Sequence, residues 1–119
     1  MGFLRNLFGG LFASSGKGEN NVERTLKEVF SEGYRIESNV DVRTLCPEYS
    51  NRYSFSFVMY DQVGNVRLVV ELLPHNGQND HWYKEAIVAL EKRNIKHVHF
   101  FTQFPNEREY VINRIRKAL

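Results

Sequence analysis

A single carboxylate interrupts one of the most apolar stretches of the chain. Glu71 lies in the run VRLVVELL, residues 66–73, whose other members are almost all aliphatic. A carboxylate in such a run is costly to bury unless it is hydrogen-bonded, paired or bound to a metal ion. Glu71 is therefore either a catalytic or metal-binding acid, or a structural acid at a sheet rim that pairs with Arg67 or Arg52.

The histidines and the one cysteine offer a second kind of chemistry. His97 and His99 alternate along one apolar segment, and His75 and His81 lie in the loop after residues 66–73. Three or four of them would suit Zn²⁺, but the compact spacing of a helical zinc motif is missing, so separately hydrogen-bonded histidines are the alternative. Cys46 is the only cysteine, which excludes an intrachain disulfide and indicates a reducing, cytoplasmic location.

Positive charge is concentrated in the last third of the chain. Residues 1–82 hold 8 Lys and Arg against 10 Asp and Glu, whereas residues 83–119 hold 8 against 4. Such an excess attracts phosphate, although it is also typical of the solvated faces of two helices. The candidate nucleic-acid-binding residues are Lys92, Arg93, Lys96, Arg114, Arg116 and Lys117.

Residues 1–18 are predicted to be an N-terminal apolar segment and linker, separate from the domain. Apolar residues between positions 3 and 12 recur at three- and four-residue spacing, which would make one stripe on a helix. The segment is too short to span a bilayer, which takes about 20 apolar residues, and it lacks the pattern of a secretory signal. The stripe suits contact with a membrane surface or a partner, or packing against its own domain.

The remaining residues, 19–119, predict a single α/β domain. Apolar periodicity predicts a helix from residue 22 to about 33, strands at 34–42, 52–60 and 66–73, a helix at 82–93, a strand at 95–101 and a helix at 106–119. Within the second strand, alternation predicts that Tyr53, Phe55, Phe57 and Met59 share one face.

The connections between these elements predict the sheet. The short turn at 61–65 makes the second and third strands an antiparallel hairpin, and the helix that follows makes the third and fourth strands parallel. The expected fold is thus a mixed β-sheet flanked by helices, in the order α-β-β-β-α-β-α.

This order, with two segments that carry it, resembles the restriction-endonuclease-like fold of the PD-(D/E)XK nuclease superfamily. YSFSFVMYDQVGNVRLVVELLPHNG is similar to the hairpin of that fold, and WYKEAIVALEKRNIKHVHFF to the helix and strand that follow it. The resemblance covers residues 22–104. It implies an Asp on the second core strand and an acid-X-Lys triplet on the third, where the two acids hold divalent ions and the Lys positions or activates water.

The chain departs from that pattern at two of the three positions. Glu71 stands where the second acid belongs, and Leu73 stands where the Lys belongs. If the hairpin pairs position i with position 127 − i, Ser56 lies opposite Glu71, and a two-residue shift brings Val58 there instead. Asp61 is five residues from Ser56 along the strand, about 17 Å away, and on the other face.

These departures predict a catalytically inactive nuclease-fold module that binds nucleic acid or a protein partner and needs no cofactor. A serine and one glutamate are poor ligands for Mg²⁺, which would have to activate the water. The alternative is an active Mg²⁺-dependent nuclease in which Glu71 acts with Lys84, supplied from the neighbouring helix. A third interpretation is a peripheral membrane or assembly adaptor that acts through residues 3–12.

Overall fold

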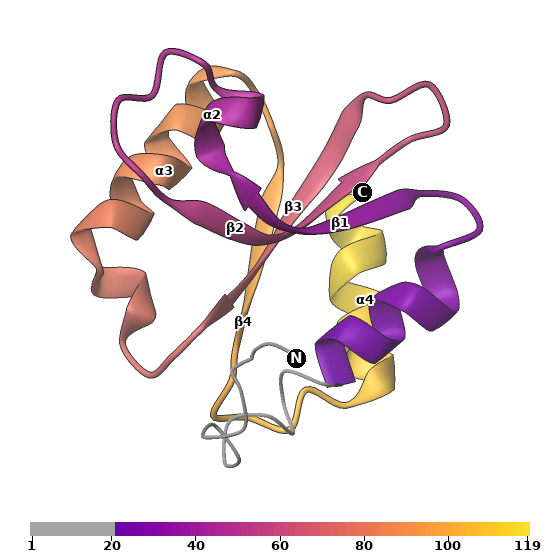
Figure 1. Ribbon diagram of the computed structural model, residues 1–119. Helices are drawn as coiled ribbons and strands as arrows, with labels where there is room; N and C mark the ends of the chain where they lie inside the picture. The colour runs from indigo at the N-terminus through magenta and orange to yellow at the C-terminus, as the bar shows by residue number, and fades with distance from the viewer. Residues whose placement is uncertain (1–20) are drawn as a thin grey trace.

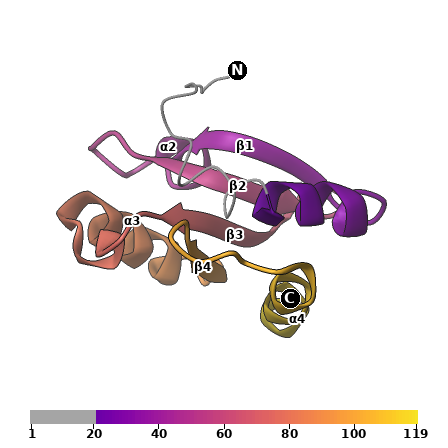
Figure 2. The same ribbon diagram turned by 90° about the horizontal axis from the view of Figure 1, so that it is seen from below.

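Four strands lie side by side in sequence order, β1-β2-β3-β4, in a mixed sheet with helices on both faces (Figures 1 and 2). This computed structural model describes residues 21–119. The strands are β1 (Arg35–Asp41), β2 (Ser54–Tyr60), β3 (Val66–Leu73) and β4 (His97–Phe101). β2 is antiparallel to both of its neighbours, and β3 and β4 are parallel, which confirms the predicted mixed α/β sheet, its hairpin and its crossover.

Aspartate side chains cap the starts of two of the helices. Residues 21–25 are helical and continue into η1 (Leu26–Phe30); the others are α2 (Val42–Leu45), η2 (Gly77–Asn79), α3 (His81–Lys92) and α4 (Arg108–Ala118). The Asp80 side chain caps α3 by accepting the backbone N–H of Tyr83 at 2.9 Å. Asp41 caps α2 in the same way, so Val42, which alternation placed in the first strand, instead begins a helix.

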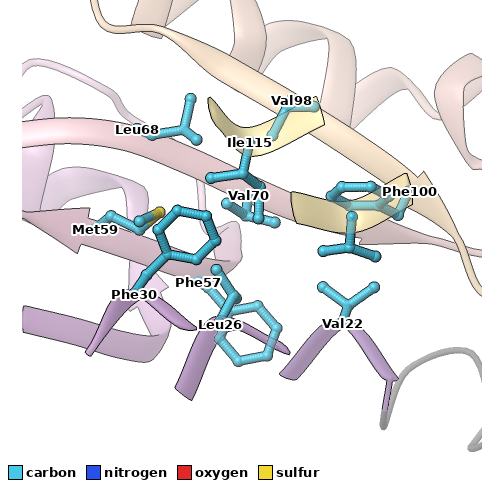
Figure 3. Close-up of a cluster of buried hydrophobic side chains, with 11 residues drawn as sticks. Val22, Leu26, Phe30, Phe57, Met59, Leu68, Val70, Val98, Phe100 and Ile115 are labelled. Carbon is cyan, nitrogen blue, oxygen red and sulfur yellow. The ribbon is translucent and has the colours of Figure 1, made fainter. Parts of the chain in front are cut away.

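The two faces of the sheet carry separate hydrophobic clusters. The first helix and α4 cover one face, and α2 and α3 cover the other (Figure 1). The cluster under α4 contains large side chains such as Leu26, Phe57 and Phe100, which point toward one another (Figure 3). The cluster under α3 combines large side chains such as Phe55 with small ones such as Val69 and Ala86.

One irregularity in β1 and β2 changes which face the side chains occupy. Phe57 belongs to the cluster under α4, but Phe55 belongs to the cluster under α3, so the prediction that they share a face is wrong. The break falls between the pairs Ser38–Phe57 and Val40–Phe55, beside Asn39, whose φ is 52°. This left-handed residue interrupts the alternation of β1, and the change of face in β2 occurs directly opposite it.

The thiol of Cys46 joins two elements of the α2–α3 face. Cys46 is fully buried at the end of α2, and its Sγ–H donates to the carbonyl of Ala89 on α3 at 3.7 Å. Burial raises the pKa of this thiol. The Cys46 side chain thus acts as a small apolar group with a weak donor, as buried cysteines usually do.

The predicted N-terminal segment, residues 1–18 with its apolar stripe at 3–12, lies outside the described residues. Within residues 21–119, no helix has the length and apolar character needed to cross a bilayer.

Candidate functional site

The carboxylate of Glu71 is buried on the face of the sheet that α3 covers. Only 2 % of the residue is exposed. The Tyr53 hydroxyl donates to Oε2 of Glu71 at 2.5 Å, and the backbone N–H of Ser56 donates to Oε1 at 2.6 Å. Both oxygens therefore have a donor from β2 or the residue before it, and the arginines proposed as partners, Arg67 and Arg52, are exposed.

The Glu71 side chain replaces a segment of backbone pairing between β2 and β3. The ladder runs from Tyr60–Val66 to Phe57–Val70 and keeps the predicted pairing of i with 127 − i at all but its first pair, where the register shifts. Beyond it, the Ser56 N–H turns to the Glu71 carboxylate and the Ser56 Oγ accepts the N–H of Leu72 at 2.9 Å. Ser56 thus lies opposite Glu71 and holds the two strands together through side-chain atoms.

Two further aromatic side chains, His99 from β4 and Tyr83 from α3, lie on the same side of the sheet as the Glu71 carboxylate. Glu71 is aligned with His99 in the parallel β3–β4 ladder. The ring of Tyr83, from α3, lies 6.5 Å from the His99 ring and 6.4 Å from the Tyr53 ring, measured between centroids. Tyr53, Tyr83 and His99 therefore form an aromatic group around the carboxylate, which we call the Glu71 cluster.

Burial is the largest cause of the pKa shifts in the Glu71 cluster. Burial raises the pKa of Glu71 above its ordinary value, against the opposing effect of the hydrogen bonds from Tyr53 and Ser56. Burial and the nearby Glu71 charge raise the pKa of Tyr53, and the same two causes raise that of Tyr83 to about 12. Burial, followed by Arg114 and His97, lowers the pKa of His99. Both phenols are thus protonated donors at neutral pH.

The residues around Glu71 do not fit a divalent metal ion. Mg²⁺ needs several free oxygen ligands, and both Glu71 oxygens already accept hydrogen bonds from the protein. Asp80, the other carboxylate whose charge reaches Tyr53, is engaged as the cap of α3. No group of three or more His, Cys, Asp or Glu in residues 21–119 is arranged to hold a metal ion.

The other positions of the predicted nuclease site lie apart from the carboxylate's oxygens. Leu73 is 3 % exposed and lines a recess of about 500 Å³ together with Tyr53 and Tyr83. Lys84 is exposed on the outer side of α3 and lines a different hollow, so the helix presents Tyr83 rather than Lys84 to the Glu71 cluster. The arrangement shields the carboxylate, and of its two donors Tyr53 also lines the recess.

The six predicted nucleic-acid-binding residues divide into two groups. Arg93 is paired with both oxygens of Glu48, at 2.6 and 3.0 Å, and Arg114 turns inward, donating to the His99 carbonyl and lying over the Phe100 ring. The remaining four are exposed: Lys92, Lys96, Arg116 and Lys117.

The four histidines do not converge. His75 contacts Gln103, His81 contacts Glu85 and His97 contacts Glu91. His99 packs against the rings of Tyr83 and Phe101. Within residues 21–119, no three His, Cys, Asp or Glu residues are grouped as metal ligands.

Sequence reasoning did not find the two tyrosines that complete the Glu71 cluster. The available signal was the rule that a buried carboxylate needs donors, combined with the inward positions of Tyr53 and Tyr83 in their own periodic patterns. Comparison with known proteins adds no candidate: no protein family, no curated protein and no solved structure matches the chain.

Proposed function

We propose that residues 21–119 form a catalytically inactive module of the restriction-endonuclease-like fold that binds nucleic acid. The element order and the parallel β3–α3–β4 crossover support this assignment, since both are features that the resemblance implies. So does the position of Glu71 on the third strand, beside the end of the hairpin ladder.

The proposed lack of catalytic activity rests on one observation: both carboxylate oxygens of Glu71 accept hydrogen bonds from groups inside the protein. The donors are Tyr53 and Ser56, and Ser56 occupies the position opposite Glu71 at which an active member would carry an acid. Leu73 supplies neither a proton nor a positive charge. Without two free carboxylates, this site does not assemble the metal-activated water that hydrolysis of a phosphodiester would use.

The basic residues of α3 and α4 support binding to phosphate. The Lys96 ammonium donates to the carbonyl of Leu119 at 3.2 Å, which brings the segment after α3 against the end of α4. The exposed residues Lys92, Lys96, Arg116 and Lys117, which we call the basic end, therefore come from two helix ends near the start of β4. Within residues 21–119, Lys92, Arg116 and Lys117 form no ion pair.

The test is binding and cleavage of labelled single- and double-stranded oligonucleotides by the purified chain. Binding should be measurable by fluorescence anisotropy at low salt and should weaken steeply as salt rises. The double variant Arg116→Gln/Lys117→Gln should weaken it and lower the salt slope by about 2. Arg24→Gln/Lys27→Gln, on the first helix, removes the same charge and should change little.

Three results would contradict the proposal. The first is an absence of binding at low salt, and the second is an equal loss of binding in the two double variants. The third is cleavage that requires Mg²⁺ or Mn²⁺ and disappears in Glu71→Ala, which would establish the active alternative.

A further inference from the structure

Two exposed aromatic rings line one hollow at the start of α4. Phe104 is 51 % exposed and Tyr110 is 50 % exposed, although both are large and largely apolar. The hollow has a volume of about 380 Å³ and is also lined by Pro105, Asn106 and Glu107. We call these five residues the aromatic patch. Exposed apolar side chains that gather around one hollow are typical of a binding surface.

Both rings of the aromatic patch pack against neighbours within the domain. The Phe104 ring meets the half-buried Phe101 ring edge-on, with 6.1 Å between centroids. The Tyr110 ring meets the buried Phe100 ring in the same way at 5.9 Å, and the Arg114 guanidinium lies 5.8 Å from it. The patch is therefore pre-formed, and a segment that binds it does not have to order these side chains first.

The chain enters the described structure at the edge of the aromatic patch. Asn21 is the first described residue, and its carboxamide donates to the carbonyl of Pro105 at 2.6 Å. The first helix thus begins beside the segment that joins β4 to α4 (Figure 1). Residues 1–20 are consequently connected to the domain at a point next to Phe104 and Tyr110.

The apolar stripe at residues 3–12 needs a surface to cover it. Its members, which would share one side of a helix, are Phe3, Leu4, Leu7, Phe8, Leu11 and Phe12. A helix this short is marginal alone in water, and Gly9 and Gly10 each cost about 1 kcal/mol within it. The polar positions of the stripe include one basic residue, Arg5, whereas helices that lie on membranes are rich in Lys and Arg. A protein surface is therefore the better match.

The length of the linker allows the stripe to meet the aromatic patch of its own chain. Residues 13–20, ASSGKGEN, separate the stripe from Asn21 and are mostly small or polar. Fully extended, they reach about 26–29 Å at 3.3–3.6 Å per residue. A flexible linker this short holds the two surfaces at an effective concentration on the order of millimolar. Contact within one chain is therefore favoured over contact between two chains in dilute solution.

We propose that residues 3–12 dock on the aromatic patch of the same chain and cover Phe104 and Tyr110 with the apolar stripe. An amphipathic helix laid on an apolar hollow is a recurring mode of recognition. Because the cover is one short segment, it is reversible, and a partner with a similar stripe would compete for the patch. Docking does not depend on the proposed nucleic-acid binding, which uses Arg116 and Lys117 at the opposite end of α4.

Trypsin cleavage after Arg5 in the full chain measures how often the segment leaves the aromatic patch. Phe104→Ser/Tyr110→Ser removes the docking surface and should speed this cleavage by about 5-fold or more, because proteolysis follows the population of the open form. Val63→Ser, at a residue that is 85 % exposed in the turn between β2 and β3, is the control and should leave the rate unchanged. Circular dichroism establishes that each variant is folded.

A second variant tests the same contact from the segment and leaves every residue of the domain unchanged. Leu7→Ser/Phe8→Ser should shift the amide NMR signals of residues 104–110, and it decides the matter alone if the patch variant does not fold. In the unaltered chain, nuclear Overhauser effects should join the Leu7 methyl groups to ring protons of Phe104 or Tyr110.

Three results would overturn docking within the chain. The first is cleavage as fast in the unaltered chain as in Phe104→Ser/Tyr110→Ser, or unchanged signals at residues 104–110 in Leu7→Ser/Phe8→Ser. The second is protection of Arg5 that increases with protein concentration, which would make a second copy the occupant. The third is protection that requires vesicles of phosphatidylcholine and phosphatidylserine, which would make a membrane surface the site of contact.

Discussion

The two faces of the sheet bury different kinds of side chain. Under the first helix and α4, the buried cluster is apolar throughout and contains large rings such as Phe57 and Phe100. Under α2 and α3, an apolar cluster lies beside the buried Glu71 carboxylate, which accepts a hydrogen bond from Tyr53. Both faces bury apolar side chains, whereas the one buried carboxylate among residues 21–119, Glu71, lies on the α3 side.

The largest effect should come from the apolar face. Phe100→Ala removes a ring that is 1 % exposed and should lower the free energy of unfolding by about 3–5 kcal/mol, since both transfer and cavity costs apply. Denaturant unfolding measures this change. Val88→Ala on the outer side of α3 is the control and should change stability by less than about 0.5 kcal/mol. Equal effects in the two variants would show that the α4 face is not a packed core.

An intermediate effect is expected at the buried carboxylate. Glu71→Ala leaves the Tyr53 hydroxyl and the Ser56 N–H without their acceptor and should cost about 2–3 kcal/mol. Glu71→Gln keeps one acceptor and should cost less. If Glu71→Ala were as stable as the unaltered chain, the carboxylate would not be part of the interior.

The difference in unfolding free energy between the unaltered chain and Glu71→Gln should depend on pH, and its sign follows from the raised pKa of Glu71. The pKa of Glu71 is raised in the folded state. At a pH between the unfolded and the folded pKa, the folded protein therefore holds a proton that the unfolded chain has released. The stabilisation from the protonated carboxyl is therefore complete below the ordinary glutamate pKa of about 4.3 and is lost as pH rises through the folded pKa. Relative to Glu71→Gln, the unaltered chain should lose stability on going from pH 4 to pH 8; a constant difference would contradict the raised pKa.

The smallest effect should come from one hydroxyl. Tyr53→Phe keeps the ring and its edge contact with Phe55 but removes the donor to Glu71, which should cost about 1 kcal/mol. Comparison with Tyr110→Phe sharpens the result, because Tyr110 is 50 % exposed and loss of its hydroxyl should change stability by less than about 0.5 kcal/mol. Equal changes in the two variants would show that the hydrogen bond from Tyr53 to Glu71 does not stabilise the fold.

Much of the sheet was predictable because its signals are local. Period-2 alternation, a five-residue turn and a helix before β4 are enough to predict the hairpin and the parallel crossover, and they leave two registers for the hairpin, of which the structure has the one that pairs Phe57 with Val70. The left-handed Asn39 was not predictable, since its effect on Phe55 depends on how β1 and β2 pair. Pattern alone also missed α2, which depends on a cap from Asp41.

The site was less predictable than the sheet because its partners come from distant segments. Glu71 was recognised as an anomaly, but its donors come from β2 and the residue before it, and sequence spacing does not fix side-chain direction. The same limit applies to the basic residues. Arg93 and Arg114 have the same charge as Arg116, and only the fold distinguishes a paired or inward guanidinium from an exposed one.

The rate at which the single thiol reacts can report an opening motion of the protein. Cys46 is shielded by the contact between α2 and α3, and its raised pKa keeps it in the unreactive protonated form. An alkylating reagent reaches it only when this contact opens, so the rate of labelling reports how often the α2–α3 face separates. The labelling rate at this one atom therefore gives the free energy of opening of the α2–α3 contact.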